Sequence, residues 1–326
     1  MLVPLAALPG ILSDCAESQT VAMLLFCPWI FDQCSFQKEK DCKDDEDAQN
    51  RCSLQFLVLQ FDFCVFACFK THGFDLYELR DANGYQPFKI QMDREVDRVF
   101  FISRNGMEYY WRTFATRGAE VYRLNYLGTE NDLPFVPHSY SDEIELLSVS
   151  NVVPVKRVHL IVEALVECAA LGIKINWTHI GDGTEMQDVR TLARERLSEG
   201  SVSFRFLGQK SNAEVHEYYR GNRADLFVNM SESEGLPVSM MEAMGYGVPV
   251  AAPNVGGIGK IVDADSGWLL SKDCCQSEFV CVIKSWSGMG EDERQRKARR
   301  AYDKWNAMFN AEKNYMEFAE AMKINY

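Results

Sequence analysis

The sequence predicts an α/β protein built on doubly wound parallel sheets. Apolar runs short enough to be strands alternate with amphipathic stretches of helical period from residue 143 onwards. In this region an apolar run at 224–228 leads into an acidic glycine loop, a helix with a proline at its start and a second apolar run at 248–252. Strand, loop, helix and strand in this order form the repeating unit of a parallel sheet, so this segment indicates the fold class.

The first half of the chain is expected to contain fewer regular elements. The apolar stretch 53–69 includes Asp62 and favours a buried strand or helix over a membrane span. A strand is expected at 96–103 and a helix at 106–114. The aromatic residues at 109–111 within that helix favour core packing over a ligand platform.

The second half of the chain shows regular alternation. It begins after a proline-rich linker at 133–137. Strands are expected at 143–151, 173–180, 202–207 and 224–229, and helices at 158–172, 184–197 and 212–221. A long amphipathic helical region at 292–323 follows.

Composition places the chain among ordinary globular proteins. Its 326 residues allow two domains, and 47% apolar with 25% charged residues is typical of a chain with a packed core. The net charge of −13 argues against non-specific nucleic-acid binding. Seven of the 11 cysteines fall in the first seventy residues without a CxxC pair, which argues against a zinc site and gives a disulfide framework little support. Met1–Ser13 lacks the basic start of a signal peptide.

Two acids eight positions apart, Glu234 and Glu242, mark the candidate site. Gly235 and Pro237 between them indicate the change from loop to helix, with Pro237 in the first helical turn. The loop then lies at the carboxyl end of a strand and at a helix N-terminus, where α/β sheets bind ligands and free N–H groups suit a phosphate. One ligand can meet both carboxylates, which suit pairs of sugar hydroxyls. The residues alone leave open the alternative of a surface acid and a helix acid paired with a lysine.

These residues carry a resemblance to a known family. The segment S-E-G-L-P-V-S-M-M-E-A-M at 233–244 resembles the signature of retaining GT-B glycosyltransferases of family 4, of the type that acts on bacterial cell-surface polysaccharides. Further segments resemble that family in order and spacing over roughly residues 140–285: S-V-S-N-V-V-P-V-K-R-V at 148–158, H-I-G-D-G at 179–183, F-L-G at 206–208 and V-G-G at 255–257. Upstream, 71–77 and 97–103 resemble pieces of the family's first domain.

The resemblance implies a GT-B fold of two Rossmann-like doubly wound domains, the N-terminal one short and atypical. Residues 1–70 would be its cysteine-rich start, without the glycine-rich first turn that the family normally supplies, and 71–136 the remainder of this acceptor domain. Residues 137–290 would form the nucleotide-sugar donor domain, and 291–326 a C-terminal helix that packs back on the N-terminal domain.

The resemblance also implies roles for individual residues. Lys156 would bind the donor diphosphate with Arg157 beside it, and Asn151 stands where the family often has a basic residue. Glu242 would bind the ribose hydroxyls and Glu234 the donor sugar. The remaining donor-site residues lie in or near glycine turns: Gly208 near the base, Gly235 and Leu236 with backbone N–H groups for phosphate or sugar, and Gly256 and Gly257 for close approach or merely a turn.

Four further residues complete the comparison with the family. His72 resembles a first-domain histidine near the reacting sugar, with a packed or surface histidine as the alternative. His179 and Asp182 are expected to be structural, in a strand and in a turn. Lys260 stands where the family often has a glutamate.

Together these roles imply transfer of a sugar from a nucleotide diphosphate sugar to a glycan or lipid-linked acceptor, with retention at the anomeric carbon. The reaction would take place in the cytoplasm, with peripheral contact at the inner face of the membrane as an option. No cofactor and no metal are expected, because basic side chains and a helix N-terminus would stabilise the leaving diphosphate. Two alternatives stay open: a nucleotide-sugar-binding remnant with an incomplete N-terminal domain, and a related enzyme such as an epimerase.

Overall fold

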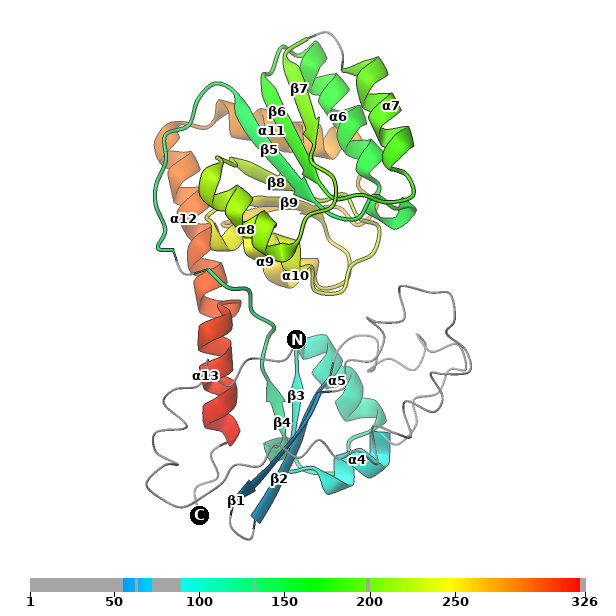
Figure 1. The fold of residues 1–326 in the computed structure, drawn as a ribbon, viewed down its shortest axis with the longest axis vertical. Helices are drawn as coiled ribbons and strands as arrows, with labels where there is room; N and C mark the ends of the chain where they lie inside the picture. Colours follow the sequence, from blue (N-terminus) through cyan, green and yellow to red (C-terminus); the bar gives the residue numbers. More distant parts are fainter. Residues whose placement is uncertain (1–54, 62–63, 72–88, 132, 198–199, 323–326) are drawn as a thin grey trace. The chain divides into compact units, whose positions relative to one another are not determined.

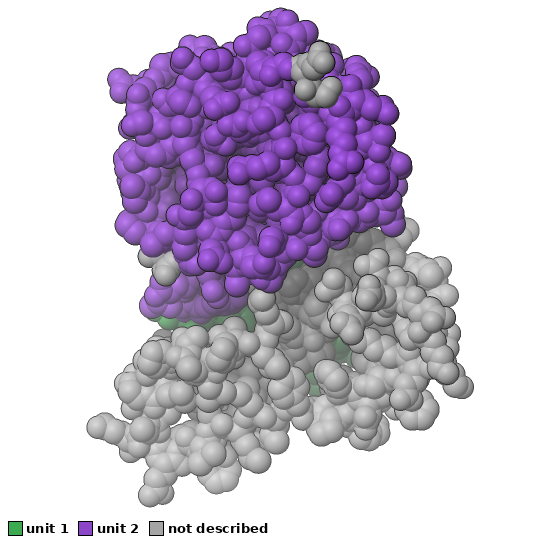
Figure 2. All heavy atoms as spheres, turned by 45° about the horizontal axis from the view of Figure 1, so that its top comes forward, with its two compact units in different colours: residues 1–126, 317–326 green, residues 127–316 purple. Residues whose placement is uncertain are grey.

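The computed structural model describes residues 55–61, 64–71, 89–131, 133–197 and 200–322. They form two compact units (Figures 1 and 2). Unit 1 comprises the described residues up to Tyr126 and from Glu317, and unit 2 comprises Leu127–Met316. The expectations for residues 1–54 and for His72 lie outside the described residues.

Unit 1 is built on a four-stranded sheet in the order β1-β2-β3-β4. The strands β1 (Gln55–Phe61) and β2 (Cys64–Thr71) are antiparallel, whereas β2, β3 (Arg98–Phe101) and β4 (Tyr122–Leu124) run parallel. Of the apolar stretch predicted at 53–69 as a strand or helix, the described residues 55–61 and 64–69 are therefore the first strand and most of the second. The strand predicted at 96–103 is confirmed as β3.

The helices of unit 1 are α4 (Lys89–Glu95) and α5 (Arg104–Thr113). The helix predicted at 106–114 is thus confirmed, and it starts two residues earlier because Ser103 caps it, accepting the Gly106 N–H at 3.1 Å. Tyr110 is fully buried with its ring edge-on to Phe101. Core packing is therefore confirmed for Tyr110, whereas Trp111 is 45% exposed.

Unit 2 contains a six-stranded, entirely parallel sheet in the order β10-β9-β8-β5-β6-β7. The first strand along the chain, β5 (Ile144–Val149), lies between β8 (Leu226–Val228) and β6 (Ile175–Ile180), so that Leu146 is in register with both Leu226 and Trp177. The strand order reverses at β5. In open α/β sheets such a switch point opens a crevice at the carboxyl ends of the strands.

The remaining strands of unit 2 extend the sheet on both sides: β7 (Val202–Phe206), β9 (Val250–Pro253) and β10 (Gly267–Leu270). Figure 1 shows α6 (Val158–Ala170), α7 (Met186–Arg196) and α11 (Gln276–Gly288) together on one face, and α8 (Asn212–Gly221), α9 (Val238–Gly245) and α12 (Glu291–Met308) on the other. The helix predicted at 158–172 is confirmed as α6, and its residues Ile161 and Leu165 are buried in the core against the sheet.

The helical region predicted at 292–323 is two helices, α12 and α13 (Ala311–Met322). Thr129 interrupts it: its N–H donates to the Phe309 carbonyl at 2.8 Å, and its own carbonyl accepts the Ala311 N–H at 3.1 Å. Its hydroxyl accepts the Trp305 indole N–H at 2.7 Å. The last turns of α13 belong to unit 1, where the Phe318 ring packs on Phe100. None of the described helices combines the length and apolar character needed to span a bilayer.

Candidate functional site

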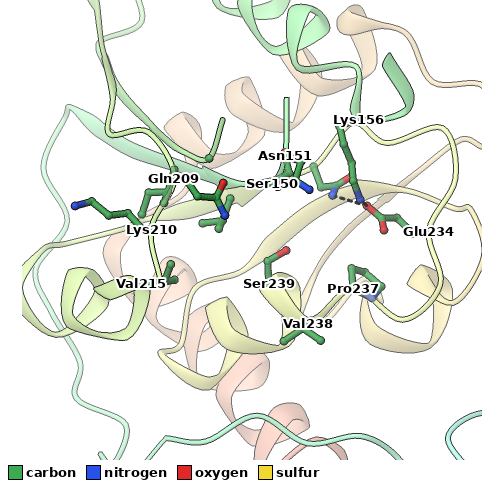
Figure 3. A pocket seen from close by; sticks show the side chains of 14 residues that line it. Ser150, Asn151, Lys156, Gln209, Lys210, Val215, Glu234, Pro237, Val238 and Ser239 are labelled. Atoms are coloured by element: carbon green, nitrogen blue, oxygen red, sulfur yellow. Dashed lines mark hydrogen bonds and ion pairs between the residues drawn. The ribbon is translucent and has the colours of Figure 1, made fainter. Parts of the chain in front are cut away.

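A pocket of about 330 Å³ opens at the switch point of the unit 2 sheet (Figure 3). Its walls come from the segments that follow β5, β6, β7 and β8, and from the start of α9. Carboxyl ends of parallel strands meet at one edge of a sheet, which is why residues so far apart in sequence converge here. The lining residues are Val149, Ser150, Asn151, Lys156, Ile180, Gly181, Gln209, Lys210, Val215, Asn229, Glu234, Pro237, Val238 and Ser239.

An ion pair between Lys156 and Glu234 lies at the pocket wall. Lys156 Nζ is 2.7 Å from Glu234 Oε1, and the two side chains are 23% and 8% exposed. Figure 3 shows them pointing toward each other, Lys156 from the turn after β5 and Glu234 from the loop before α9. The pair confines a positive and a negative group to one side of the pocket, where low exposure weakens screening by water.

Asn229 fixes the same carboxylate from a second direction. Its Nδ2 donates to Glu234 Oε1 at 3.1 Å, and its Oδ1 accepts the Ser231 N–H at 2.7 Å. The loop of Glu234 and the turn of Lys156 are also joined by their backbones, since the Glu232 N–H donates to the Val155 carbonyl at 2.8 Å. The Glu234 carboxylate is therefore oriented before any ligand arrives.

Arg157 lies beside Lys156 in sequence but takes a different direction. Its Nε donates to the Met230 carbonyl at 2.7 Å, and its Nη2 is 3.9 Å from Cys274 Sγ. It adopts a left-handed backbone conformation, with φ of 47°, as the residue before α6. The pocket lining includes Lys156 but not Arg157. The Arg157 guanidinium thus binds the backbone that follows β8, whereas the prediction placed it beside Lys156 at the diphosphate.

The two glycines of the V-G-G segment let two loops touch. A Cβ on Gly256, whose φ is 55°, would stand 1.7 Å from the Glu234 carbonyl oxygen, and one on Gly257 would stand 2.3 Å from that of Gly235. The Gly257 N–H donates to the Gly235 carbonyl at 2.8 Å. Close approach and a simple turn were the two roles predicted for these glycines. The structure shows close approach, and the segment that they approach is the backbone of Glu234 and Gly235.

Gly235 and Leu236 connect Glu234 to the start of α9. A Cβ on Gly235 would meet nothing within 4 Å, so internal packing does not require a glycine there. Pro237, predicted in the first helical turn, precedes it as the N-cap with an extended backbone. The first two residues of the helix, Val238 and Ser239, line the pocket, which brings the unpaired N–H groups of a helix N-terminus to its wall.

Glu242 lies one turn deeper in α9 and is only 6% exposed. Its Oε1 accepts a hydrogen bond of 2.5 Å from Asn212 Nδ2 and lies 3.8 Å from His216 Nε2. Burial raises the pKa of Glu242 to about 7, and the Asn212 hydrogen bond acts in the opposite direction. The lysine pairing considered for the helix acid is therefore found at Glu234, and Glu242 is instead paired with an amide.

The predicted structural role of His179 agrees with its surroundings. Ser148 Oγ accepts the Trp177 indole N–H at 2.9 Å and lies 2.8 Å from His179 Nδ1. The Ser148 hydroxyl thus links the Trp177 indole to the His179 ring inside the core. Burial lowers the pKa of His179 to about 4, so the ring is neutral at pH 7.

The other predicted residues are divided between the pocket and its frame. Asn151 lines the pocket. Gly208, with φ of 71°, accepts the Gly181 N–H at 2.9 Å and so ties the turns after β6 and β7 together. Sequence reasoning missed four polar residues of the pocket or its border: Gln209, Lys210, Asn212 and Asn229. Their only sequence signal is position, since each ends or follows a predicted strand or begins a predicted helix on the same sheet edge.

Residues 130–304, more than half of the chain, match the family model described as "Glycosyl transferases group 1". The putative colanic acid biosynthesis glycosyltransferase WcaL of Escherichia coli (strain K12) is 26% identical over 267 residues, 77% of this chain and 63% of that protein. The amylovoran biosynthesis glycosyltransferase AmsK of Erwinia amylovora is 26% identical over 189 residues, 55% of this chain and 44% of that protein. The chain thus spans less than two thirds of the length of these relatives.

Solved structures share the fold at low sequence identity. S. aureus TarM aligns with a TM-score of 0.60 at 16% identity, covering 78% of this chain and 50% of that one. Anabaena HepE, solved with UDP and glucose, aligns with a TM-score of 0.58 at 18% identity, covering 78% and 71%. These likenesses support the GT-B class of fold predicted from the sequence.

Proposed function

Because the chain belongs to the group 1 glycosyl transferases, we propose that it moves a sugar from a nucleoside diphosphate sugar to an acceptor, with retention at the anomeric carbon. The observation that carries the proposal is the Lys156–Glu234 pair, 2.7 Å apart in a pocket at the sheet's switch point. The lysine suits a diphosphate and the carboxylate suits sugar hydroxyls. Their contact therefore marks where the bond between the diphosphate and the sugar of a bound nucleotide sugar would lie.

The proposed donor lies across the pocket in three parts. Lys156 binds the diphosphate together with the N–H groups at the start of α9, where Val238 and Ser239 line the wall. Glu234 accepts hydrogen bonds from hydroxyls of the sugar, and Glu242, beside Asn212, accepts those of the ribose. As the sugar–phosphate bond breaks, charge grows on the leaving diphosphate, and a cation and helix dipole already aimed at it lower the barrier.

The relatives supply the class of donor and acceptor for the proposal. WcaL and AmsK are named as glycosyltransferases of colanic acid and amylovoran biosynthesis, and HepE was solved with UDP-glucose. We therefore take a UDP-sugar as the first donor to test and a glycan or lipid-linked saccharide as the acceptor. The proposed reaction is a cytoplasmic step in surface polysaccharide synthesis, with peripheral contact at the inner membrane face when the acceptor is lipid-linked.

The direct test is binding of UDP to the full chain, measured by calorimetry. Lys156→Ala is expected to weaken UDP binding about tenfold or more, since a hydrogen bond to a charged group contributes about 1.5–3 kcal/mol. Lys284→Ala, which removes an exposed lysine from α11, is the matched control and is expected to bind as the unaltered chain does. Equal UDP affinity in the Lys156→Ala variant would overturn the phosphate assignment. GDP and ADP, titrated in parallel, identify the base.

Transfer itself needs a separate measurement. A panel of UDP-sugars incubated with the full chain, with and without lipid-linked saccharide, should give product whose anomeric configuration, read by NMR, matches that of the donor. Binding of UDP without transfer to any acceptor would favour the alternative of a nucleotide-sugar-binding module.

A further inference from the structure

We propose that Asn212 is a positioning residue of the donor site, which keeps the Glu242 carboxylate charged and oriented for a nucleotide's ribose hydroxyls. The inference rests on the proposed function, and it assigns a role to a residue outside the conspicuous acid-glycine motif. Among the hydrogen bonds of the described residues, Glu242 accepts one, from Asn212 Nδ2 to Oε1 at 2.5 Å. Oε1 is therefore occupied by the protein, and the rest of the carboxylate's accepting capacity is left for a ligand.

The place of Asn212 is fixed by the start of α8. Ser211 and Glu214 form a capping box: the Ser211 hydroxyl accepts the Glu214 N–H, and the Glu214 carboxylate accepts the Ser211 N–H at 2.8 Å. Asn212 is the first residue of that helix. It is exposed to solvent, whereas Glu242, which accepts its hydrogen bond, is buried. The amide is thus held over the carboxylate by a rigid helix start.

The same loop connects Asn212 to the pocket. Gln209 and Lys210 line the pocket three and two residues before it, and Val215 lines it three residues after. Ser239, one turn before Glu242 on α9, lines it from the other side. The pocket lining thus includes residues on both sides of Asn212 in the chain and the turn of α9 that precedes Glu242.

The charge of Glu242 is finely balanced at neutral pH. Its carboxyl is buried, and burial raises its pKa to about 7, so that near pH 7 the charged and neutral forms are both present. The titratable groups that face it are His216 and Tyr219 of α8, with His216 Nε2 at 3.8 Å, while Tyr246 meets the other ring nitrogen of His216 at 2.9 Å. The helix α12 also packs against α9, and its buried residues, Ala298, Ala301 and Trp305, are uncharged.

The hydrogen bond from the Asn212 amide counteracts the rise in the pKa of Glu242 that burial causes. It stabilises the carboxylate and so favours the form that accepts hydrogen bonds from two hydroxyls. Removing the amide should move the titration of Glu242 upward by about one pH unit, because a hydrogen bond to a charged group and one pKa unit correspond to similar free energies. A chain without the amide would then bind nucleotide poorly at pH 7 and normally at higher pH.

The experiment measures UDP affinity of the full chain by calorimetry from pH 6 to pH 9. The variants are Asn212→Ala, Asn212→Asp and the control Gln187→Ala, which removes an exposed amide on α7. The UDP phosphate titrates in the same way with every variant. The ratio of each variant's UDP affinity to that of the unaltered chain is therefore compared across the pH range. Asn212→Ala should bind about fivefold to tenfold more weakly at pH 7 and within about twofold at pH 9. Asn212→Asp, which adds a like charge, should show a larger loss displaced to higher pH.

Two results would overturn the inference while leaving the proposed function intact. A loss that is equal at every pH marks Asn212 as merely structural, and an unchanged affinity removes it from the site. If the unaltered chain binds no nucleotide at any pH, the proposed function fails, and with it the positioning role. A ligand-free comparison checks the Asn212–Glu242 coupling by itself: the Tm of Asn212→Ala should match that of the unaltered chain near pH 4 and fall below it above pH 7.

Discussion

The carbonyl oxygen of Glu234 occupies the space that a Cβ on Gly256 would need, at 1.7 Å from its ideal position. The catalytic candidate and the glycine come from different loops, twenty-two positions apart in sequence. Because Glu234 also bonds Lys156 and Asn229, the position of one small residue determines where three polar groups lie. The glycine turn is therefore part of the site even without touching a ligand.

Gly256→Ala should disturb the fold and the site together. The methyl group would overlap the Glu234 carbonyl, and the left-handed backbone, with φ of 55°, adds about 1–2 kcal/mol of strain for a non-glycine residue. We expect a Tm lower by about 5 °C or more, measured by calorimetry, together with weaker UDP binding. Gly288→Ala is the matched control, since a Cβ there meets nothing within 4 Å. A Gly256→Ala chain as stable as that control would contradict the steric argument.

Gly235→Ala separates stability from ligand approach. A Cβ at Gly235 has nothing within 4 Å, so the Tm should stay within about 2 °C of the unaltered chain. If a nucleotide sugar approaches this backbone, the added methyl should still weaken binding of a UDP-sugar severalfold. Unchanged donor affinity, measured by calorimetry, would show that no ligand comes close to this residue.

Glu234→Gln should separate chemistry from nucleotide binding. The amide keeps the shape of the side chain but loses the charge that pairs with Lys156. Turnover should fall by about a hundredfold or more if the carboxylate acts on the sugar in the transition state, while affinity for free UDP should change by less than about threefold. Initial rates and calorimetry measure the two quantities. A loss of UDP affinity as large as that in Lys156→Ala would assign Glu234 to the diphosphate.

Glu242→Gln should increase stability while weakening nucleotide binding. The pKa of Glu242 is raised to about 7, so the folded chain binds a proton more tightly than the unfolded chain and loses stability as pH rises from about 4.5 to 7. At pH 8 this cost is about 3 kcal/mol, which an uncharged glutamine avoids. The Tm of Glu242→Gln should therefore exceed that of the unaltered chain at pH 8 and approach it at pH 4. A difference in Tm between the variant and the unaltered chain that is the same at pH 4 and pH 8 would contradict a raised pKa. The control is Glu217→Gln, which removes an exposed charge from α8.

Arg157→Gly should lower stability more than it lowers nucleotide affinity. Glycine accepts the left-handed backbone at φ of 47°, so the variant isolates the lost guanidinium, which bonds the Met230 carbonyl at 2.7 Å. We expect a drop in Tm of a few degrees, because the hydrogen bond contributes about 1–2 kcal/mol, and a change in UDP affinity below about threefold. A folded Arg157→Gly chain with tenfold weaker UDP binding would instead show that the guanidinium binds the phosphate.

Local signals determined much of the fold of residues 143–316. Apolar runs and helical periods marked the strands and helices from β5 to β8 within a few residues, because each is one continuous segment whose buried face repeats with the backbone. The acid-glycine motif located the loop before α9 for the same reason, since a glycine and a proline restrict the backbone of their own neighbours. The chemistry of Glu234 and Lys156 likewise followed from residue type and from the resemblance of their segments.

Contacts between distant segments were decided only by the tertiary structure. Lys156 and Glu234 stand seventy-eight positions apart, and no period in the sequence states that they meet at 2.7 Å. Arg157 has the same charge as its neighbour but turns to Met230, because its left-handed backbone redirects the side chain. The partnership of Asn212 with Glu242 depends on how α8 and α9 pack on one face of the sheet. The sequence by itself determined which groups are available, and the packing of helices on a parallel sheet determined which of them lie within reach of one another.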